Sequence, residues 1–277
     1  MLRLWHLITM LIAQISDTHL AGGQAKTFGI APMAENLARC VQHINALQPP
    51  PDVVLITGDI TNDGRAEEAE RAARILRKLR FPFYIVPGNH DNPETLLNAF
   101  EPGACPVSSA RFVNYVISGY DIKIIGLDST WPQHPGGFIS PQQANWLDAH
   151  LQAIGPEPVI LFMHHPPVSF GVLETDEDGF EGAELLAEVL LRHGTVRHIL
   201  AGHIHLPATT TWHGMVVGTA PSPGMRLALD LTLTQPSAFL LDDPAYQLHY
   251  WTKQNHLITH TVRIPSTAVL HPFENLT

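Results

Sequence analysis

The sequence is poor in basic residues and has no cluster of them. Its 277 residues include 16 lysines and arginines against 26 aspartates and glutamates, for a formal net charge of -10 at pH 7. A protein that binds the phosphate backbone of nucleic acids normally carries a basic stripe. The sequence therefore disfavours a nucleic-acid polymer as partner, although bound divalent cations would reverse the sign of a pocket locally.

Cysteine is also scarce, and long apolar runs are absent. Cys40 and Cys105, the only two cysteines, lie far apart and in no spacing typical of metal sites. We expect free thiols in a reducing compartment, with a disulfide within or between chains as the alternative. No segment reaches the roughly 18 uninterrupted apolar residues that a membrane span requires. These absences predict a cytoplasmic protein without a membrane partner.

The first part of the chain, residues 2–15, is largely apolar and superficially resembles a signal peptide. No small-x-small cleavage site precedes Asp17, and cleavage there would remove the apolar strand that leads into it. We therefore interpret residues 11–16 as a core strand. The residues before Met10 then form a short extension, and translation starts at either Met1 or Met10.

The order of apolar segments predicts an α/β fold. With 45% hydrophobic and 15% charged residues, the chain is long enough for one large domain with an appendage, or for two small domains. Apolar stretches alternate with segments of helical periodicity, which is typical of a mostly parallel sheet with right-handed crossovers. We expect strands at 11–16, 53–57, 83–86, 159–163 and 196–200, helices at 31–47, 67–79, 140–153 and 181–192, and a hairpin of 112–117 with 122–127.

The composition changes after residue 206, where threonine, proline and short strand-like segments dominate and no chemical motif occurs. Strands are expected at 215–219 and 239–241, with a hairpin at 247–264. We expect residues 1–206 to form the functional core. Residues 207–277 are expected to form a small β-rich cap that completes the fold and serves in dimerisation. The acidic residues 174–178 are interpreted as a solvated loop, with a segment that gates the pocket as the alternative.

Five of the expected strands end in polar side chains. Three to six apolar residues lead each time into carboxylate, amide or imidazole groups. Because the carboxyl ends of parallel strands share one edge of a sheet, we expect these groups to gather in one site. The five strand ends are Asp17-Thr18-His19, Gly58-Asp59, Gly88-Asn89-His90-Asp91, His164-His165-Pro166 and Gly202-His203-Ile204-His205.

The metal-binding side chains at these ends are Asp17, His19, Asp59, Asn89, His164, His203 and His205. Seven ligands of mixed nitrogen and oxygen type are too many for one ion and suit two, with the Asp59 carboxylate able to bridge them. Imidazole with carboxylate favours divalent or trivalent Mn, Fe, Zn or Co over Ca²⁺ or Mg²⁺. Two such ions, about 3.5 Å apart, lower the pKa of a shared water and clamp a phosphoryl oxygen for in-line displacement. The sequence therefore predicts hydrolysis of phosphate esters.

In this order the five strand ends resemble the motifs of the calcineurin-like metallophosphoesterases, and within them the bacterial cyclic-nucleotide and glycerophosphodiester phosphodiesterases (class III phosphodiesterases). The resemblance spans residues 11–206 and includes Asn62 and Gly64 after the second strand end. It implies a four-layer α-β-β-α sandwich of two mixed sheets. It also implies a binuclear hydrolase of small phosphodiesters, such as cyclic AMP or glycerophosphodiesters, in which a metal-bridging hydroxide attacks phosphorus in line. Relatives often self-associate through the C-terminal segment, which implies a homo-oligomer.

The resemblance further implies roles for individual residues. One ion would be held by Asp17, His19, Asp59 and His205, and the other by Asp59, Asn89, His164 and His203. Asp59 and Asn89 would act in catalysis together with His90, which would orient the phosphate or protonate the leaving alkoxide. His165 and Asp91 are expected to support the ligands rather than bind metal. The loop around Phe28 and the segment Leu127-Asp128-Ser129 match regions that line the substrate pocket in relatives.

One departure from a sister branch is informative. Ser/Thr protein phosphatases carry an arginine directly before the glycine that ends the second motif, where this chain has Asp63 before Gly64. Since that arginine grips phosphate, the acidic residue disfavours a protein phosphatase. The alternatives to a phosphodiesterase are a phosphomonoesterase or nucleotide pyrophosphatase with the same metal site, and a non-catalytic binding scaffold. The scaffold is disfavoured because every ligand position is filled.

Overall fold

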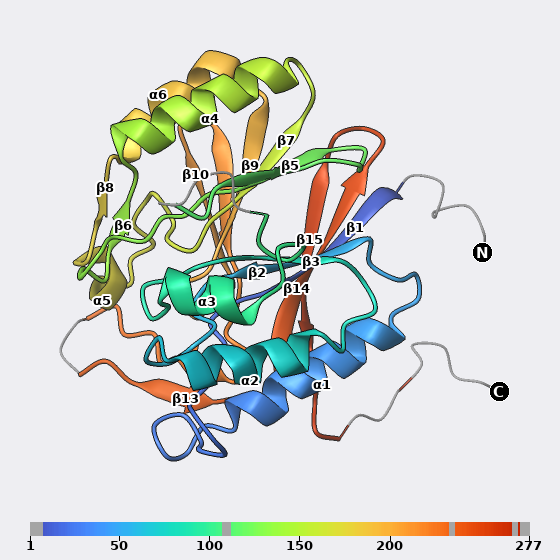
Figure 1. Ribbon diagram of the computed structural model, residues 1–277, viewed down its shortest axis with the longest axis vertical. Helices are drawn as coiled ribbons and strands as arrows, with labels where there is room; N and C mark the ends of the chain where they lie inside the picture. Colours follow the sequence, from blue (N-terminus) through green and yellow to red (C-terminus); the bar gives the residue numbers. More distant parts are fainter. Residues whose placement is uncertain (1–7, 107–111, 233–235, 268–270, 272–277) are drawn as a thin grey trace.

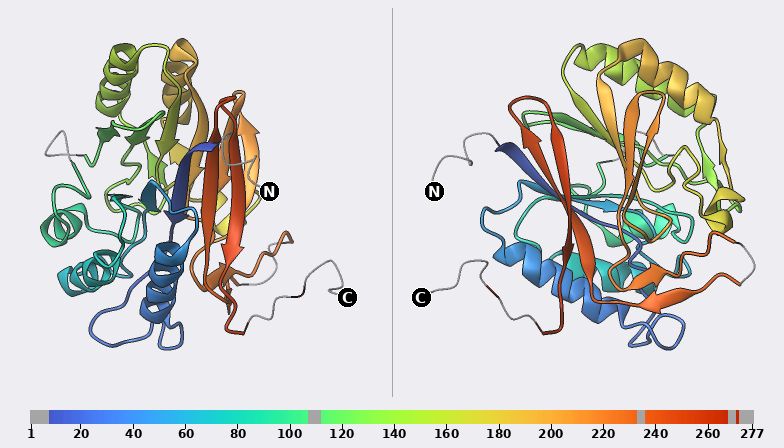
Figure 2. Two further views of the ribbon diagram at one scale, coloured as in Figure 1. Left: turned by 90° about the vertical axis from the view of Figure 1, so that its right-hand side faces the viewer. Right: turned by 180° about the vertical axis from the view of Figure 1, so that it is seen from behind.

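The chain folds around two β-sheets that lie between two sets of helices (Figures 1 and 2). This computed structural model describes residues 8–106, 112–232, 236–267 and 271. In Figure 1, α4 and α6 lie above the sheets, and α1 and α2 lie below them. The helix bounds are Met33–Ala46 for α1, Ala66–Leu76 for α2, Pro141–Ile154 for α4 and Ala183–His193 for α6. The layers confirm the four-layer α/β sandwich expected from the sequence.

The first sheet has the strand order β15-β14-β1-β2-β3. Strands β1, β2 and β3 run parallel, whereas β14 pairs antiparallel with both β1 and β15. Helices α1 and α2 connect the parallel strands, as the alternation of apolar and helical segments predicted. The strand bounds are Ile8–Ile15 for β1, Val53–Thr57 for β2, Phe83–Val86 for β3, Ala245–Thr252 for β14 and Leu257–Arg263 for β15.

The second sheet has the order β10-β11-β9-β7-β5-β4. Its central strands β11, β9, β7 and β5 are parallel. The antiparallel pair β4 and β5 is the hairpin expected at 112–127, and β10 pairs antiparallel with β11 at the other edge. The bounds are Tyr115–Ile117 for β4, Lys123–Gly126 for β5, Val159–Phe162 for β7, Val196–Ala201 for β9, Ala208–Trp212 for β10 and Met215–Thr219 for β11.

Local sequence signals explain where the covering helices begin and which face they bury. Helix α4 begins at Pro141, and the Ser140 hydroxyl accepts a hydrogen bond from the Gln143 N–H at 3.2 Å. Such a cap satisfies one of the free N–H groups at a helix start. Helix α1 buries Leu37 and Ile44 completely, at the helical spacing seen in the sequence. These contacts fix the helices on the sheets and so fix the loops at the strand ends.

The segment after residue 206 is β-rich, as expected, but most of it belongs to the main sheets. Strands β10 and β11 extend the second sheet, and β14 and β15 extend the first. Among the described residues after 206, only β12 (Met225–Leu227) and β13 (Phe239–Leu241) form a separate ribbon. Strand β14 is buried along nearly its whole length because it is an inner strand of the sandwich. The division at residue 206 and the role in dimerisation stay predictions.

Several short elements escaped the sequence pattern because they are too short to show a period. They are α3 (Pro93–Ala99), α5 (Leu173–Asp176), β6 (Gly137–Phe138), β8 (Phe180–Glu181) and β12; the five-residue strand β10 was missed as well. The interpretation of 174–178 as a plain loop was wrong in part, since α5 occupies its start. The Asp176 carboxylate ties this turn down by accepting from the N–H groups of Phe170 and Gly171 at 2.9 and 2.8 Å. None of the helices in the described part of the chain is long and apolar enough to cross a membrane.

Candidate metal centre

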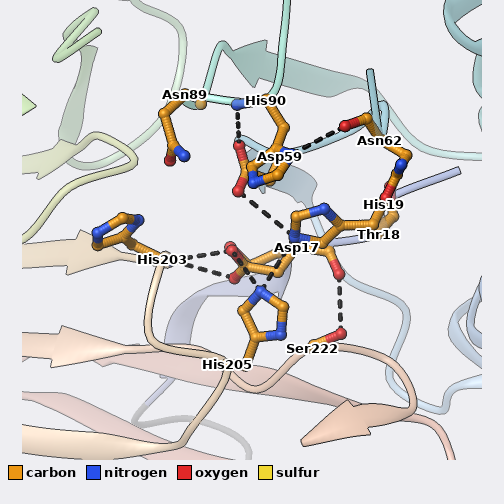
Figure 3. A network of polar contacts seen from close by, with 12 residues as sticks. Asp17, Thr18, His19, Asp59, Asn62, Asn89, His90, His203, His205 and Ser222 are labelled. Carbon is orange, nitrogen blue, oxygen red and sulfur yellow. Dashed lines mark hydrogen bonds and ion pairs between the residues drawn. The ribbon is translucent and has the colours of Figure 1, made fainter. Parts of the chain in front are cut away.

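The seven predicted ligands lie together where the carboxyl ends of the two sheets meet. Strands β1, β2 and β3 of the first sheet lead into Asp17 with His19, into Asp59 and into Asn89, whereas β7 and β9 of the second lead into His164 and into His203 with His205. Figure 3 shows side chains from both sheets arranged around a common space. The site is therefore assembled from two sheets rather than from one edge.

The backbone at these strand ends is left-handed. Positive φ angles occur at Asp17 (54°), His19 (41°), Asp59 (48°), His203 (74°) and His205 (55°). This conformation costs a non-glycine residue about 1–2 kcal/mol and persists only where surrounding contacts enforce it. Here the N–H of Asp17 donates to Gly58 at 3.0 Å and that of His19 donates to Asp59 at 2.8 Å. The strain turns the side chains out of the strand direction and into the common space.

A first group of donor atoms comes from Asp17, His19, Asp59 and His205, and these atoms all lie within 4.8 Å of one another. Nε2 of His19 is 3.0 Å from Nε2 of His205 and 3.4 Å from Oδ2 of Asp59. Nε2 of His205 is 3.6 Å from Oδ1 of Asp17. Four ligand atoms thus converge on one point.

A second group contains His164, Asn89 and His203 and shares the Asp59 carboxylate. Nε2 of His164 is 3.1 Å from Oδ1 of Asn89 and 3.4 Å from Oδ2 of Asp59. The ring of His203 lies 5.1 Å from that of His164, and its backbone N–H donates to the Asp17 carboxylate at 3.0 Å. Oδ2 of Asp59 therefore faces an imidazole of each group at the same distance.

The orientation of the imidazoles fits a pair of cations. Nδ1 of His205 donates to the Met225 carbonyl at 2.8 Å, and Nδ1 of His164 donates to the Thr57 carbonyl at 2.7 Å. With Nδ1 held in this way, Nε2 is the ring atom that faces the centre, where it can bind a cation. Nε2 of His205 lies 3.6 Å from Oδ1 of Asp17, and Nε2 of His164 lies 3.4 Å from Oδ2 of Asp59, so each imidazole faces a carboxylate. The donor set suits transition-metal ions.

His165 lies against this centre, but its ring nitrogens are already engaged. Nε2 donates to the Pro135 carbonyl at 3.0 Å, which leaves Nδ1 to accept from the Ser129 hydroxyl at 2.9 Å. Its ring lies 4.6 Å from the rings of both His164 and His203. His165 therefore packs the two imidazoles into place, in keeping with the supporting role expected from the sequence.

The charges of the buried groups shift one another's pKa values. Burial lowers the pKa of His164, but the charge and hydrogen bond of Asp59, the charge of Asp17 and the bond to the Thr57 carbonyl together outweigh burial and raise it to about 9. Burial raises the pKa of Asp59, yet His164 and His19 hold it well below its usual value. Burial together with the charge of His164 lowers the pKa of His203 to about 3. A cation that takes Nε2 of His164 therefore replaces a proton, whereas His203 has none to lose near neutral pH.

His90 is exposed beside the two groups. Its backbone N–H donates to Oδ1 of Asp59 at 2.9 Å, and its ring Nδ1 donates to the Asn62 carbonyl at 2.8 Å. The ring lies edge-on to His19, with centroids 4.7 Å apart. This arrangement leaves Nε2 of His90 free to exchange a proton with a bound molecule.

Asp91 supports the same loops from below the centre. Its carboxylate accepts from the N–H groups of Ile60, Thr61 and Gly88 at 3.0, 2.8 and 3.0 Å. Burial, followed by the nearby charge of Asp59, raises the pKa of Asp91 to about 6. The side chain fastens the loop after β2 to the loop after β3, as expected for a residue that supports ligands.

A cavity of about 470 Å³ opens over the centre. The residues of the metal centre that line it are His19, Asp59, Asn89, His90, His203 and His205. The rest of the lining is mostly apolar and comes largely from the loop before α1 and from the β12–β13 ribbon, with Phe28, Met225, Leu227 and Phe239. Thr175 and Asp178, close to α5, add a hydroxyl and a carboxylate.

Most of this lining was not predicted from the sequence. The prediction that the loop around Phe28 lines the pocket is confirmed. The same expectation for Asp128 was wrong, since its carboxylate accepts from the N–H groups of Val113 and Thr130 at 3.1 and 2.9 Å and is buried. The contributions of Met225 and Leu227 were missed, because a three-residue strand carries no periodic signal.

The fold is similar to that of a solved dimetal phosphatase from Danio rerio. The TM-score is 0.62 at 18% sequence identity, and the match covers 92% of this chain and 99% of that chain. A second solved structure, the GAP50 anchor of the inner membrane complex of Plasmodium, has a TM-score of 0.56 at 14% identity over 94% of this chain and 90% of that chain. At these identities the likeness shows the fold alone.

Proteins found by sequence similarity are more similar to this chain than these solved structures are. The chain is 37% identical to a probable glycerophosphodiester phosphodiesterase GpdQ from Arcobacter nitrofigilis, over 96% of this chain and 97% of that protein. It is 30% identical to the glycerophosphodiester phosphodiesterase GpdQ of Enterobacter lignolyticus, over 91% and 92%. A 3',5'-cyclic-nucleotide phosphodiesterase of Nostoc is 24% identical over 94% and 95%. Residues 10–207 match the family model of the calcineurin-like phosphoesterases, and the chain belongs to this family.

Proposed function

We propose that the protein is a binuclear metal-dependent phosphodiesterase that acts on small phosphodiesters. The observation that carries this proposal is the pair of donor groups that share Oδ2 of Asp59, which is 3.4 Å from Nε2 of His19 and 3.4 Å from Nε2 of His164. A shared carboxylate is what a two-metal hydrolase needs, because both ions must face the same phosphate.

The ligand assignment follows from the two donor groups. Asp17, His19, Asp59 and His205 hold one ion, and Asp59, Asn89, His164 and His203 hold the other, with Mn, Fe, Zn or Co as the candidate metals. Bound there, two cations supply positive charge for the phosphoryl oxygens and lower the pKa of a water molecule. His90, anchored through Nδ1 to the Asn62 carbonyl, orients the phosphate or gives a proton from Nε2 to the leaving alkoxide.

Charge at the cavity favours a diester over a monoester. Among the described residues that line it, none is lysine or arginine, and Asp178 adds a carboxylate. A phosphomonoester carries about one more negative charge than a diester near neutral pH, and the cavity offers it no additional cation. The arginine-bearing position of the Ser/Thr phosphatases is here Asp63, which is exposed. The phosphomonoesterase is therefore the weaker candidate.

The names of the relatives support two substrate classes. The GpdQ proteins, which match almost the whole chain, are named for glycerophosphodiesters, and the Nostoc protein is named for cyclic nucleotides. We keep both as candidate substrates. The homo-oligomer and the cytoplasmic location expected from the sequence likewise stay predictions.

Hydrolysis by metal-stripped protein, reconstituted separately with Mn²⁺, Zn²⁺, Fe²⁺ and Co²⁺, tests the proposal. The substrates are a bis-aryl phosphodiester, the matching monoester, cyclic AMP and a glycerophosphodiester, with Asn89→Ala and His90→Ala in parallel. We expect the diesters to turn over only with metal, and Asn89→Ala to lose most of that activity. Turnover of the monoester alone would replace the proposal with a phosphomonoesterase.

A further inference from the structure

Two phenylalanine rings face each other beside the metal centre. The centroids of Phe28 and Phe239 are 5.6 Å apart, and their planes are inclined by 34°. Both residues line the cavity that also contains His19 and His205. Phe28 comes from the loop between β1 and α1, and Phe239 begins β13, so the pair exists only in the folded chain.

Phe28 is held in a conformation that is unfavourable for its side chain. Its φ is 50°, and 61% of the residue is exposed. The turn around it is closed by backbone hydrogen bonds in both directions between Thr27 and Ala31, at 3.0 and 2.9 Å. A bulky residue in left-handed backbone, with its ring in the open, gains little for folding. Backbone outliers of this kind cluster at active sites and ligand clamps.

The pair is fixed to the metal ligands from both sides. The Thr27 hydroxyl donates to the carbonyl of His19 at 2.5 Å. Phe239 packs against a small buried cluster that includes Met225, whose carbonyl accepts from Nδ1 of His205 at 2.8 Å. A ring bound against Phe28 and Phe239 would therefore keep a set position relative to a phosphate at the metal centre.

The chemistry of the lining defines what the pair binds. The described lining beyond the metal centre is mostly apolar and contains no lysine or arginine. Flat aromatic groups gain offset or tilted ring contacts with such a pair, whereas a strongly hydrated group gains nothing. We propose that Phe28 and Phe239 bind an aromatic ring on an ester group of the phosphodiester, either an aryl group or a nucleobase. This inference rests on the proposed phosphodiesterase function and names its substrate class.

Kinetics with ring-bearing and ring-free diesters test the inference. The variants are Phe28→Asn, which suits the left-handed turn, and Phe239→Leu, which keeps an apolar side chain. Ile30→Ala is the matched control, because Ile30 is 55% exposed on the same loop and does not line the cavity. Both Phe variants are expected to raise KM about tenfold, the loss of one ring contact with its buried area, for ring-bearing diesters with kcat little changed. KM for glycerophosphoethanolamine is expected to stay unchanged.

The ring-bearing substrates separate the two sources of the ring. A rise in KM for both bis(p-nitrophenyl) phosphate and cyclic AMP assigns the pair to aryl groups and nucleobases alike, and a rise for one of them assigns it to that class. The melting temperature of Phe28→Asn is expected not to fall, since the substitution relieves the backbone. An equal rise in KM for the ring-free diester, or no rise for any diester, would overturn the inference.

Binding without turnover separates this inference from the proposed function. Calorimetric titration of the metal-loaded protein with diphenylphosphinate and dimethylphosphinate compares two anions of equal charge whose P–C bonds the protein cannot hydrolyse. We expect the Phe variants to weaken binding of diphenylphosphinate about tenfold, again the loss of a ring contact, and to leave dimethylphosphinate unchanged. Ring-selective binding without hydrolysis of any diester would refute the phosphodiesterase and keep the aromatic pair. Hydrolysis of diesters without ring selectivity would refute the aromatic pair alone.

Discussion

Metal binding at His164 is expected to release a proton, and the surroundings of this ring determine how many protons are released at a given pH. Nδ1 of His164 is fixed by the Thr57 carbonyl, and Nε2 lies 3.4 Å from Oδ2 of Asp59. Burial lowers the pKa of this ring, but the charge and hydrogen bond of Asp59, helped by Asp17 and the Thr57 carbonyl, together outweigh burial and raise it to about 9. At pH 7 such a ring is roughly 99% protonated, so a cation that takes Nε2 displaces about one proton from it. Protonation competes with the metal below the raised pKa, and apparent affinity falls about tenfold per pH unit from 9 to 7 through this residue alone.

Isothermal titration calorimetry measures this release directly. Metal-stripped protein is titrated with Mn²⁺ at pH 7 in buffers of different ionisation enthalpy, and the dependence of the heat on the buffer gives the number of protons. The matched variants are His164→Gln and His203→Gln. The first is expected to lose about one proton of release, whereas the second keeps it, because the pKa of His203 is about 3 and its ring has no proton to lose. A wild-type protein that releases no proton at pH 7, or two variants that behave alike, would contradict the raised pKa of His164.

Two further predictions concern acid stability and a close approach at the centre. Burial, then the charge of a neighbouring histidine, lowers the pKa of His249 from 6.5 to about 3, so its stabilising contribution is complete above pH 6.5 and is lost as pH falls toward 3. At pH 5 the free energy of unfolding is expected to be about 2 kcal/mol lower than at pH 7 through this residue. Urea unfolding at both pH values should show a smaller loss of unfolding free energy in His249→Gln than in the wild-type protein. An equal loss in the two proteins would contradict the lowered pKa of His249. A Cβ at Gly88 would lie 2.2 Å from Oδ1 of Asp59, whereas one at Gly103 would meet nothing within 4 Å. Gly88→Ala is therefore expected to abolish metal binding in the same titration and Gly103→Ala to preserve it, and wild-type affinity in Gly88→Ala would refute the role of this contact.

The donor atoms of the centre could be predicted from the sequence because each follows directly after an apolar strand that the local sequence marks. A run of apolar residues such as Val53–Thr57 fixes a buried strand, and the polar side chain that follows it must then lie at the carboxyl edge. Parallel order brings Asp17, Asp59 and Asn89 to one edge without knowledge of the rest of the chain. His164 and His203 follow buried strands of the second sheet in the same way.

The lining of the cavity could not be predicted, because it depends on pairing between segments that carry no signal of their own. Strands β12 and β13 have three residues each and are joined only when Leu227 meets Phe239 across the ribbon. The left-handed backbone at Phe28 is invisible in the sequence, since nothing around a phenylalanine marks it for that conformation. Tertiary contacts decide the pairing of the ribbon, whereas hydrogen bonds between Thr27 and Ala31 close the turn at Phe28.

One glycine shows how local and tertiary information combine at the centre. In the sequence Gly202 looks like an ordinary turn residue before His203. In the structure a Cβ there would lie 1.9 Å from Oγ of Ser16 and 2.8 Å from Oδ2 of Asp17. Because Ser16 and Asp17 end a strand of the first sheet and Gly202 ends a strand of the second, the missing side chain is what lets the two edges approach. That approach allows the His203 N–H to donate to the Asp17 carboxylate. The centre between the two sheets therefore depends on the absence of a Cβ atom at Gly202.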